Sequence, residues 1–226
     1  FKLAHAVDQR LEQLVDFAID PILGYLTACP TNLGTGMRAS SMLHLPGLVL
    51  SDQIGPVLKG INKLGLAVRG LYGEGTESLG NLYQISNQST LGESEGEILD
   101  RLTRVIGDVA QYELQAREKL MTEDSIMLRD RIGRAAGNLS YAHIITSKEA
   151  LNHLSMLRLG ADLTLLPADL VESCDRLFME TQPAHLQWGA GRKLEPEARD
   201  IIRAQMIREK LQSSLPPAID LSGKEN

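Results

Sequence analysis

Apolar residues recur along this chain with helical spacing in some stretches and with strand-like spacing in others. Over residues 2–17 they return every three to four positions, which predicts an amphipathic helix that ends before Pro21. A second helical pattern covers residues 48–64. Ser94 followed by Glu97 is a capping-box pattern, and it predicts the start of a long helix.

Short apolar runs between these helices predict strands. The runs 25–28 and 37–45 lie on either side of the glycine turn Gly34–Gly36, and we expect them to pair as a hairpin. Two further runs, 66–71 and 82–86, flank a segment rich in glycine. The first half of the chain is therefore expected to contain an antiparallel sheet flanked by helices.

Strand patterns disappear after about residue 121. Thr146 and Glu149 form a second capping pattern, and Pro167 and Pro196 are expected in the first turns of helices. The predicted fold class is thus α+β: an antiparallel sheet flanked by helices, followed by an all-helical C-terminal domain. We expect a catalytic domain over residues 1–121, a helical domain over 122–212 and a disordered tail over 213–226.

Composition narrows the function classes. The chain has 226 residues, a net charge of −6, 43% hydrophobic and 23% charged residues, which is ordinary for a globular protein. The negative charge disfavours nucleic-acid binding, and no apolar run approaches the roughly 18 residues of a membrane span. No signal peptide is recognisable, so a cytoplasmic protein that binds no membrane is expected. Because the chain opens on Phe1 directly in helix-like sequence, we expect a fragment or a shortened form.

The candidate chemistry does not include a resident metal. Cys29 and Cys174 lie far apart in the sequence, and the histidines show no metal-ligand spacing. Neither a zinc site nor a disulfide framework is predicted. Any magnesium would arrive with a nucleotide, held by phosphates and water.

Three stretches carry candidate chemistry. The first, residues 29–38, places the thiol of Cys29, a glycine turn and Arg38 within one short segment. The second, residues 68–77, has Arg69 just before a glycine-rich loop that contains Glu74. In isolation such a cysteine is more often buried and inert, and such arginines are more often solvated surface residues.

Together the first two stretches resemble the cysteine signature and the mobile substrate loop of guanidino kinases. The resemblance implies that Arg38 and Arg69 grip ATP phosphates, for which a planar guanidinium provides bidentate bonds. It implies that Cys29 lies beside the substrate guanidinium, and that Glu74 is a catalytic carboxylate that holds or deprotonates it. The full set of ATP-binding candidates is Arg38, Ala39, Ser40, Ser41, Met42, Arg69, Gly70, Leu71, Tyr72, Gly73 and Glu74. The strand 83–87 that follows is assigned to scaffold.

The third stretch lies on a predicted helix near the C-terminus. Arg199 and Arg203 are four residues apart and are expected to project from one face with Asp200 on its flank. Such a set complements phosphoarginine, although by itself it is more often a solvated charged face. The stretch resembles the phosphoarginine pocket of protein-arginine kinases of the McsB type, a branch of the guanidino kinases. The candidates are Arg199, Asp200, Ile201, Ile202, Arg203 and Ala204.

The resemblance implies a protein-arginine kinase that uses ATP and Mg²⁺, marks proteins with exposed arginines for a Clp protease, and responds to phosphoarginine allosterically. It also implies an activator protein of the McsA type and a homodimer. The relatives have an upstream region with further phosphate-binding arginines and a second carboxylate, which this sequence lacks. Two alternatives stay open. One is a metabolite kinase acting on free arginine, and the other is an inactive phosphoarginine-binding module.

Overall fold

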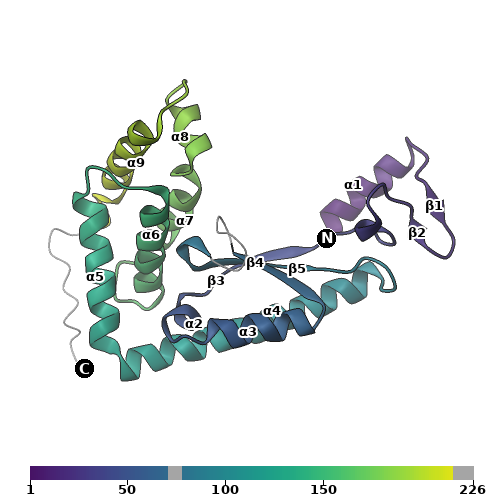
Figure 1. Ribbon diagram of the computed structural model, residues 1–226, viewed down its shortest axis with the longest axis horizontal. Coiled ribbons are helices and arrows are strands. Elements are labelled where there is room, and N and C mark those ends of the chain that lie inside the picture. Colours follow the sequence, from purple (N-terminus) through teal and green to yellow (C-terminus); the bar gives the residue numbers. More distant parts are fainter. Residues whose placement is uncertain (71–77, 216–226) are drawn as a thin grey trace.

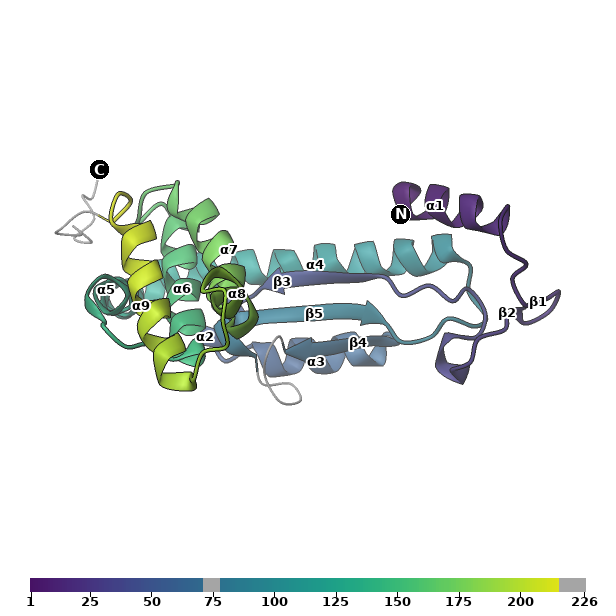
Figure 2. The ribbon, with the colours of Figure 1, turned by 90° about the horizontal axis from the view of Figure 1, so that it is seen from above.

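The computed structural model describes residues 1–70 and 78–215. Three parts follow one another along its long axis (Figure 1, Figure 2): an N-terminal segment, a sheet backed by helices, and a helical bundle. The helices are α1 (Lys2–Glu12), α2 (Pro46–Leu50), α3 (Ile54–Lys63), α4 (Glu95–Glu123), α5 (Ser125–Tyr141), α6 (Ser147–Asp162), α7 (Leu170–Glu180), α8 (Pro183–Gly189) and α9 (Pro196–Leu211). The strands are β1 (Ile19–Asp20), β2 (Gly24–Tyr25), β3 (Ser40–His44), β4 (Leu66–Gly70) and β5 (Leu82–Asn87). Short 3-10 turns are η1 (Pro30–Asn32) and η2 (Leu79–Asn81).

The central sheet is antiparallel, with strand order β3-β5-β4. Because side chains alternate along a strand, one face of the sheet collects the apolar residues of all the strands. Val68 and Ile85 are paired across the strands and lie buried on this face, together with Leu66 and Tyr83. Helices α3 and α4 run along the same face (Figure 1). The predicted α+β class is confirmed.

The predicted hairpin between residues 25–28 and 37–45 is wrong. Strand β2 pairs with β1, and it contacts the glycine turn only through a bridge between Tyr25 and Gly34. Strand β3 pairs with β5 instead. Pro30 begins the turn η1 and has no N–H to donate to a ladder, whereas pairing with β5 buries the apolar face of β3 against α4.

The helix predicted over residues 48–64 is two helices. Pro46 starts α2 two residues earlier than predicted, and the chain breaks at Asp52, which has a φ of 57° before α3 begins. The first predicted helix is also shorter in the structure: α1 ends at Glu12, and none of its residues is buried.

Helix α4 connects the two main hydrophobic cores. The capping box of Ser94 and Glu97 at its start is confirmed. Its residues up to Ala116 pack in the core under the sheet, whereas Leu120 belongs to the core of the helical bundle. The chain leaves helical geometry at Asp124, and α5 then begins. Both cores therefore share one continuous helix.

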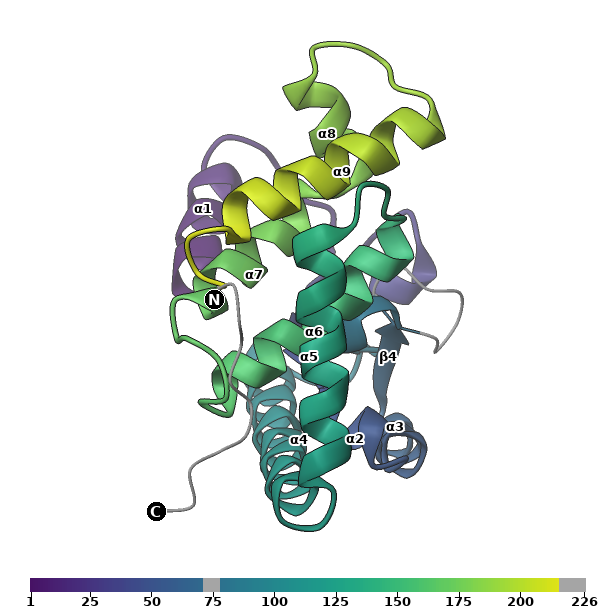
Figure 3. The same cartoon turned by 90° about the vertical axis from the view of Figure 1, so that its left-hand side faces the viewer.

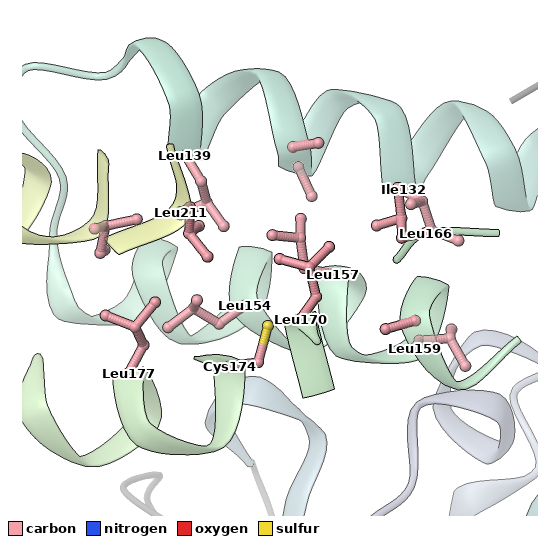
Figure 4. Packing of buried hydrophobic residues seen from close by; sticks show 14 of the residues in the cluster. Ile132, Leu139, Leu154, Leu157, Leu159, Leu166, Leu170, Cys174, Leu177 and Leu211 are labelled. Carbon is pink, nitrogen blue, oxygen red and sulfur yellow. The ribbon is translucent and has the colours of Figure 1, made fainter. Parts of the chain in front are cut away.

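The bundle consists of α5 to α9 (Figure 3). Its leucine-rich core is formed mainly by α5, α6, α7 and α9, and α8 packs against α9. Cys174 lies among these leucines (Figure 4), and burial raises the pKa of its thiol to about 12. The predicted cap at Thr146 and the first-turn position of Pro196 are confirmed. The first-turn prediction for Pro167 is wrong, because its carbonyl accepts from the amide of Leu170 in a turn that precedes α7.

His44 is half-buried where the end of β3 meets the bundle, with its imidazole largely enclosed. Its Nε2 lies 2.8 Å from Ser155 Oγ on α6, and its ring faces that of Phe178 at 6.2 Å. Burial, with the cations of Arg117 and Arg158 nearby, lowers the pKa of His44 to about 3. The folded protein therefore holds this imidazole in its neutral form.

We expect this histidine to make folding stability depend on pH. Below the unfolded pKa of about 6.5 the unfolded chain binds a proton that folded His44 does not, so stability falls by about 1.4 kcal/mol per pH unit. The loss continues down to about pH 3, the folded pKa. His44→Gln should remove this part of the slope in urea unfolding between pH 4 and 6, while exposed His143→Gln should keep it. Equal slopes for wild type and His44→Gln would contradict the prediction.

Candidate functional site: the open face of the sheet

The sheet has a second face that α3 and α4 do not cover. Ser40 pairs with Ser86, and the next same-face row consists of Met42, Gln84 and Arg69. Gln84 Nε2 donates to Ser40 Oγ at 3.0 Å, which links two strands across this face. We call the side of the sheet that carries these residues and Arg38 the open face.

Arg38 lies just before β3 and is exposed, with its Nη2 donating to Ser86 Oγ at 3.2 Å. The backbone on both sides of Arg38 is held by one buried side chain, Asn87. The Asn87 carboxamide accepts from Ala39 N at 2.8 Å and donates to Met37 O at 3.0 Å. The strand entrance is therefore fixed, and the Arg38 guanidinium is aimed over the open face.

Arg69 is exposed on β4, in the same row as Gln84 and Met42. With strands about 4.8 Å apart and about 3.3 Å per residue, its Cα lies on the order of 16 Å from that of Arg38. Two long side chains on one face at this separation can converge on a single polyphosphate. The structure thus brings these two predicted residues to a common surface.

The other predicted ATP-binding residues do not all lie on the open face. Ser40 and Met42 lie on the open face, and Gly70 ends β4 opposite Tyr83. Ala39 packs against the core under the sheet, so its side chain points away from the open face. The predicted residues Leu71, Tyr72, Gly73 and Glu74 lie outside the described residues, as does the predicted disordered tail 213–226 from position 216 onward. For its first residues the prediction of disorder is wrong, because Leu215 is buried in the bundle core and the Ser214 hydroxyl donates to Asp169.

Sequence reasoning missed two residues of this site. Ser86 and Asn87 were assigned to scaffold, yet one accepts from Arg38 and the other holds the backbone around it. Both are polar and almost fully buried, at 2% and 4% exposure. Buried polar side chains need hydrogen-bond partners, which is why these two are tied to Arg38 and its neighbours. The only signal in the sequence was a pair of polar residues closing the strand pattern, and it does not show that they are buried.

Cys29 is exposed at the start of η1, in a loop tied to the far end of β5. Thr90 makes this tie by donating its hydroxyl to the carbonyls of Thr31 and Leu33 at 3.0 and 2.8 Å. The loop joins the sheet at the end where β3 starts, whereas Gly70 of β4 lies at the opposite end. The described residues do not bring Cys29 next to Arg69.

The thiol of Cys29 is tuned by Thr31. The hydroxyl of Thr31 lies 3.0 Å from Sγ, and with the Thr31 backbone amide it lowers the pKa of Cys29. Thr31→Val should raise this pKa and shift the pH profile of Cys29 alkylation by iodoacetamide to higher pH, because the thiolate is the reactive form. Thr103→Val, an exposed position on α4, is the control. A profile unchanged by Thr31→Val would contradict the role of the hydroxyl.

The predicted phosphoarginine residues lie on α9, but they are not arranged as the helical spacing predicts. Arg203 is 1% exposed rather than solvent-facing. Its Nε donates to Thr181 O and its Nη1 to Ile145 O, each at 2.9 Å, and it pairs with Asp200. The side chain of Arg203 points into the protein because the carbonyls of Thr181 and Ile145 accept its hydrogen bonds there. Arg199 is partly exposed, and of the two arginines it is the one that reaches the surface.

Ala204 is also buried, whereas Ile201 is exposed and Ile202 is intermediate. Only part of the predicted six-residue set is therefore available at the surface of α9.

A cavity elsewhere does not include the arginines of the open face. It has a volume of about 560 Å³ and lies between α1 and the loop that leads to Met37, with His5, Phe17 and Tyr25 in its lining. Among residues 1–70 and 78–215, no group of three or more His, Cys, Asp or Glu side chains could hold a metal ion. A Mg²⁺ ion carried by nucleotide phosphates fits a face whose own charged groups are arginines.

Residues 1–116, more than half of the chain, match the family model described as ATP:guanido phosphotransferase, C-terminal catalytic domain. The chain belongs to the ATP:guanido phosphotransferase family. Residues 125–221 match a second model, described as the protein-arginine kinase McsB C-terminal domain. The open face lies within the catalytic match, and α5 to α9 lie within the second. The predicted relationship to guanidino kinases of the protein-arginine branch is confirmed.

Similar proteins in this family carry the name protein-arginine kinase. The relative from Moorella thermoacetica is 52% identical over 211 residues, which cover 93% of this chain and 60% of the relative. The relative from Syntrophomonas wolfei is 48% identical over 213 residues, covering 94% and 59%. The chain thus spans about 60% of the length of these curated relatives.

Solved structures of the same family are also similar to this chain. A lombricine kinase matches with a TM-score of 0.41 and 32% identity, over 50% of this chain and 30% of that one. A duplicated taurocyamine kinase from Schistosoma mansoni matches with a TM-score of 0.44 and 23% identity, over 73% and 28%. Within the described residues, no helix is long and apolar enough to span a membrane.

Proposed function

We propose that the protein is an ATP-dependent kinase that phosphorylates arginine side chains of proteins. The observation that carries the proposal is the open face, where exposed Arg38 and Arg69 lie on one surface and Arg38 is held by buried polar residues. The family match and the relatives named protein-arginine kinase support the arginine substrate. The match of residues 125–221 favours protein substrates over a free metabolite.

In this proposal Arg38 and Arg69 bind the phosphates of ATP with charge-assisted hydrogen bonds. Mg²⁺, held by the nucleotide rather than by protein side chains, would reduce the negative charge of the phosphates that the two arginines bind. Met42, which is 48% exposed in the same row as Arg69, offers an apolar surface beside them. Asn87 and Ser86 keep Arg38 oriented, so little reorganisation is needed when charge shifts between phosphate oxygens.

The transfer step forms one bond and breaks one. A substrate guanidinium nitrogen attacks the γ-phosphorus, an N–P bond forms, and the bond between the γ-phosphorus and the bridging oxygen of the leaving ADP breaks. The proton lost by the nitrogen goes to a carboxylate, for which Glu74 is the candidate in the family signature. A thiolate at Cys29 would attract the substrate cation, and its lowered pKa favours that charge.

We further propose that α9 binds phosphoarginine and regulates the kinase allosterically. Arg199 would contact the phosphate, while Asp200 and Arg203 form a preassembled pair beside it. Arg199→Ala should weaken phosphoarginine binding by about 10- to 100-fold, the loss of one charge-assisted contact, without changing ATP affinity. Titration calorimetry with phosphoarginine and with ATP measures both.

The biological setting belongs to the same proposal. The kinase would act in the cytoplasm, mark clients for Clp-type proteolysis, respond to an activator of the McsA type, and form a homodimer. Each of these partners is expected from the protein-arginine branch of the family.

The full-length gene product, given radiolabelled ATP and Mg²⁺, tests the proposal with two substrates. Phosphate on arginine residues of an unfolded protein, in an acid-labile linkage located by mass spectrometry, is the expected result. Label on free arginine alone would assign a metabolite kinase. Phosphoarginine binding without any transfer would assign a binding module.

A further inference from the structure

Strand β5 contacts both hydrophobic cores. Leu82, its first residue, packs against the core of the helical bundle, as does Leu79 in the preceding turn. Tyr83 and Ile85 belong to the core under the sheet. The central strand of the sheet is therefore anchored in the bundle before it enters the sheet.

The turn η2 that precedes β5 is pressed against α6. Gly80 has a φ of 66°, and a Cβ atom there would lie 3.0 Å from Leu151 O and 3.1 Å from the ring of Phe178. Its amide donates to Asn152 Oδ1 at 3.0 Å. Glycine suits this position because a side chain would collide with α6 and with the Phe178 ring, and because the backbone has a positive φ. The Asn152 side chain accepts the hydrogen bond of the Gly80 amide, which would otherwise lack a partner where it meets α6.

Ser155 joins the same helix to two strand ends. Its hydroxyl oxygen accepts from Asn81 Nδ2 at 2.7 Å and lies 2.8 Å from Nε2 of His44, the last residue of β3. Asn81 also accepts, through its carbonyl, the amide of Leu45 at 2.9 Å. Ser155 is fully buried, so each of these bonds lies in a poorly solvated environment where a missing partner is costly.

Asn152 and Ser155 are three residues apart and so lie on one face of α6. That face holds the end of β3 and the turn that opens β5. The place of Arg69 depends on β5, since β4 pairs only with β5 in the described sheet and Arg69 is opposite Gln84, whereas Arg38 lies just before β3. The position of α6 therefore determines, through these strands, how far the Arg69 guanidinium lies from Arg38.

We propose that Asn152 and Ser155 are positioning residues for phosphoryl transfer, through which the helical bundle sets the geometry of the open face. This proposal rests on the kinase function proposed above. Packing alone would need only apolar side chains at this contact. The contact instead uses two polar side chains with fixed partners, Ser155 fully buried and Asn152 at an exposed position, and such hydrogen bonds select one arrangement. A change in the bundle that moves α6 reaches Arg69 through η2 and β5.

A second set of bonds ties the same parts together. Buried Glu113 of α4 accepts from the amides of Gly47 and Leu48 at 2.8 and 2.9 Å, at the start of α2. Arg117 pairs with Glu113 at 2.6 Å and with Asp162 of α6 at 2.9 Å. This chain of ion pairs fixes the far end of α6 to α4, so Asn152 and Ser155 act from a helix that is itself held in place.

The test uses the full-length kinase with Asn152→Ala, Asn152→Asp and Ser155→Ala. Asn152→Ala removes the acceptor of the Gly80 amide, whereas Asn152→Asp keeps an acceptor at an exposed position. Exposed Asn62→Ala on α3 is the matched control. Hydrogen exchange at the Gly80 amide reports anchoring independently of activity, and steady-state kinetics report kcat and the KM for ATP separately.

We expect Asn152→Ala to speed hydrogen exchange of the Gly80 amide about ten-fold, because that amide loses one hydrogen bond. The variant should also lower kcat at least about ten-fold, because a small displacement of Arg69 weakens its binding of the transition state. The KM for ATP should change less than about two-fold, and Asn152→Asp should restore both readouts. Ser155→Ala should lower kcat in the same way with a melting temperature that still shows a folded protein.

Two results would overturn the proposal in an active kinase. One is unchanged Gly80 exchange in Asn152→Ala. The other is faster exchange with unchanged kcat, which would make the contact structural only. A wild-type protein without any arginine phosphorylation would instead overturn the proposed function, and it would be recognised before any variant is compared.

Discussion

Arg69→Ala is expected to lower kcat/KM for ATP by about 10²- to 10³-fold in the proposed full-length kinase, the usual cost of removing one group that stabilises developing charge. Arg69 is exposed on β4 and lies in the row of Gln84 and Met42, so its side chain has no part in either core. Folding should therefore survive the change. Steady-state kinetics with ATP as the varied substrate, together with a melting curve, separate the two effects.

Two matched variants sharpen this prediction for Arg69. Arg69→Lys keeps the charge but loses the planar fork, so it should recover only part of the activity. Arg104→Ala removes an exposed arginine from α4, the helix that covers the other face of the sheet, and should leave kcat/KM unchanged. If Arg69→Lys were fully active, the guanidinium geometry would not matter. If Arg69→Ala were fully active, the open face would not be the phosphate site.

Local signals in the sequence predicted much of the fold because they act over a few residues. The capping boxes at Ser94 and Thr146 each satisfy an amide three residues away, and they mark helix starts correctly. The partner of β3 could not be found in this way. Its choice of β5 over β2 depends on burying an apolar face against α4, which begins more than fifty residues after β3 starts. Strand pairing of this kind is decided by tertiary packing.

The site shows the same division between local and tertiary information. Arg38 and Arg69 were identified from their motifs, but their common face follows from the register that places Arg69 beside Gln84. The opposite error occurred on α9. Helical spacing predicted that Arg199 and Arg203 would project from one face of the helix, and it could not show that the carbonyls of two distant loops would bind one of them.

The largest loss of stability is expected from Arg203→Ala. Its guanidinium donates to Thr181 O and Ile145 O and pairs with Asp200, at 1% exposure. Removing it leaves two buried carbonyls and a partly buried carboxylate without their partner, a loss of about 3–5 kcal/mol. At about 2–4 °C per kcal/mol for a chain of this size, Tm should fall by about 6–20 °C in a calorimetric scan.

Arg199→Ala is the matched control, because Arg199 lies on the same helix and is partly exposed. It should change stability by less than about 0.5 kcal/mol. Equal Tm values for the two variants would show that Arg203 is not held as the structure has it. The difference in Tm between the two variants also decides how measurements of phosphoarginine binding are interpreted. A loss of phosphoarginine binding in Arg203→Ala would follow from a loosened α9 alone, so Arg199→Ala is the variant that tests direct contact with the ligand.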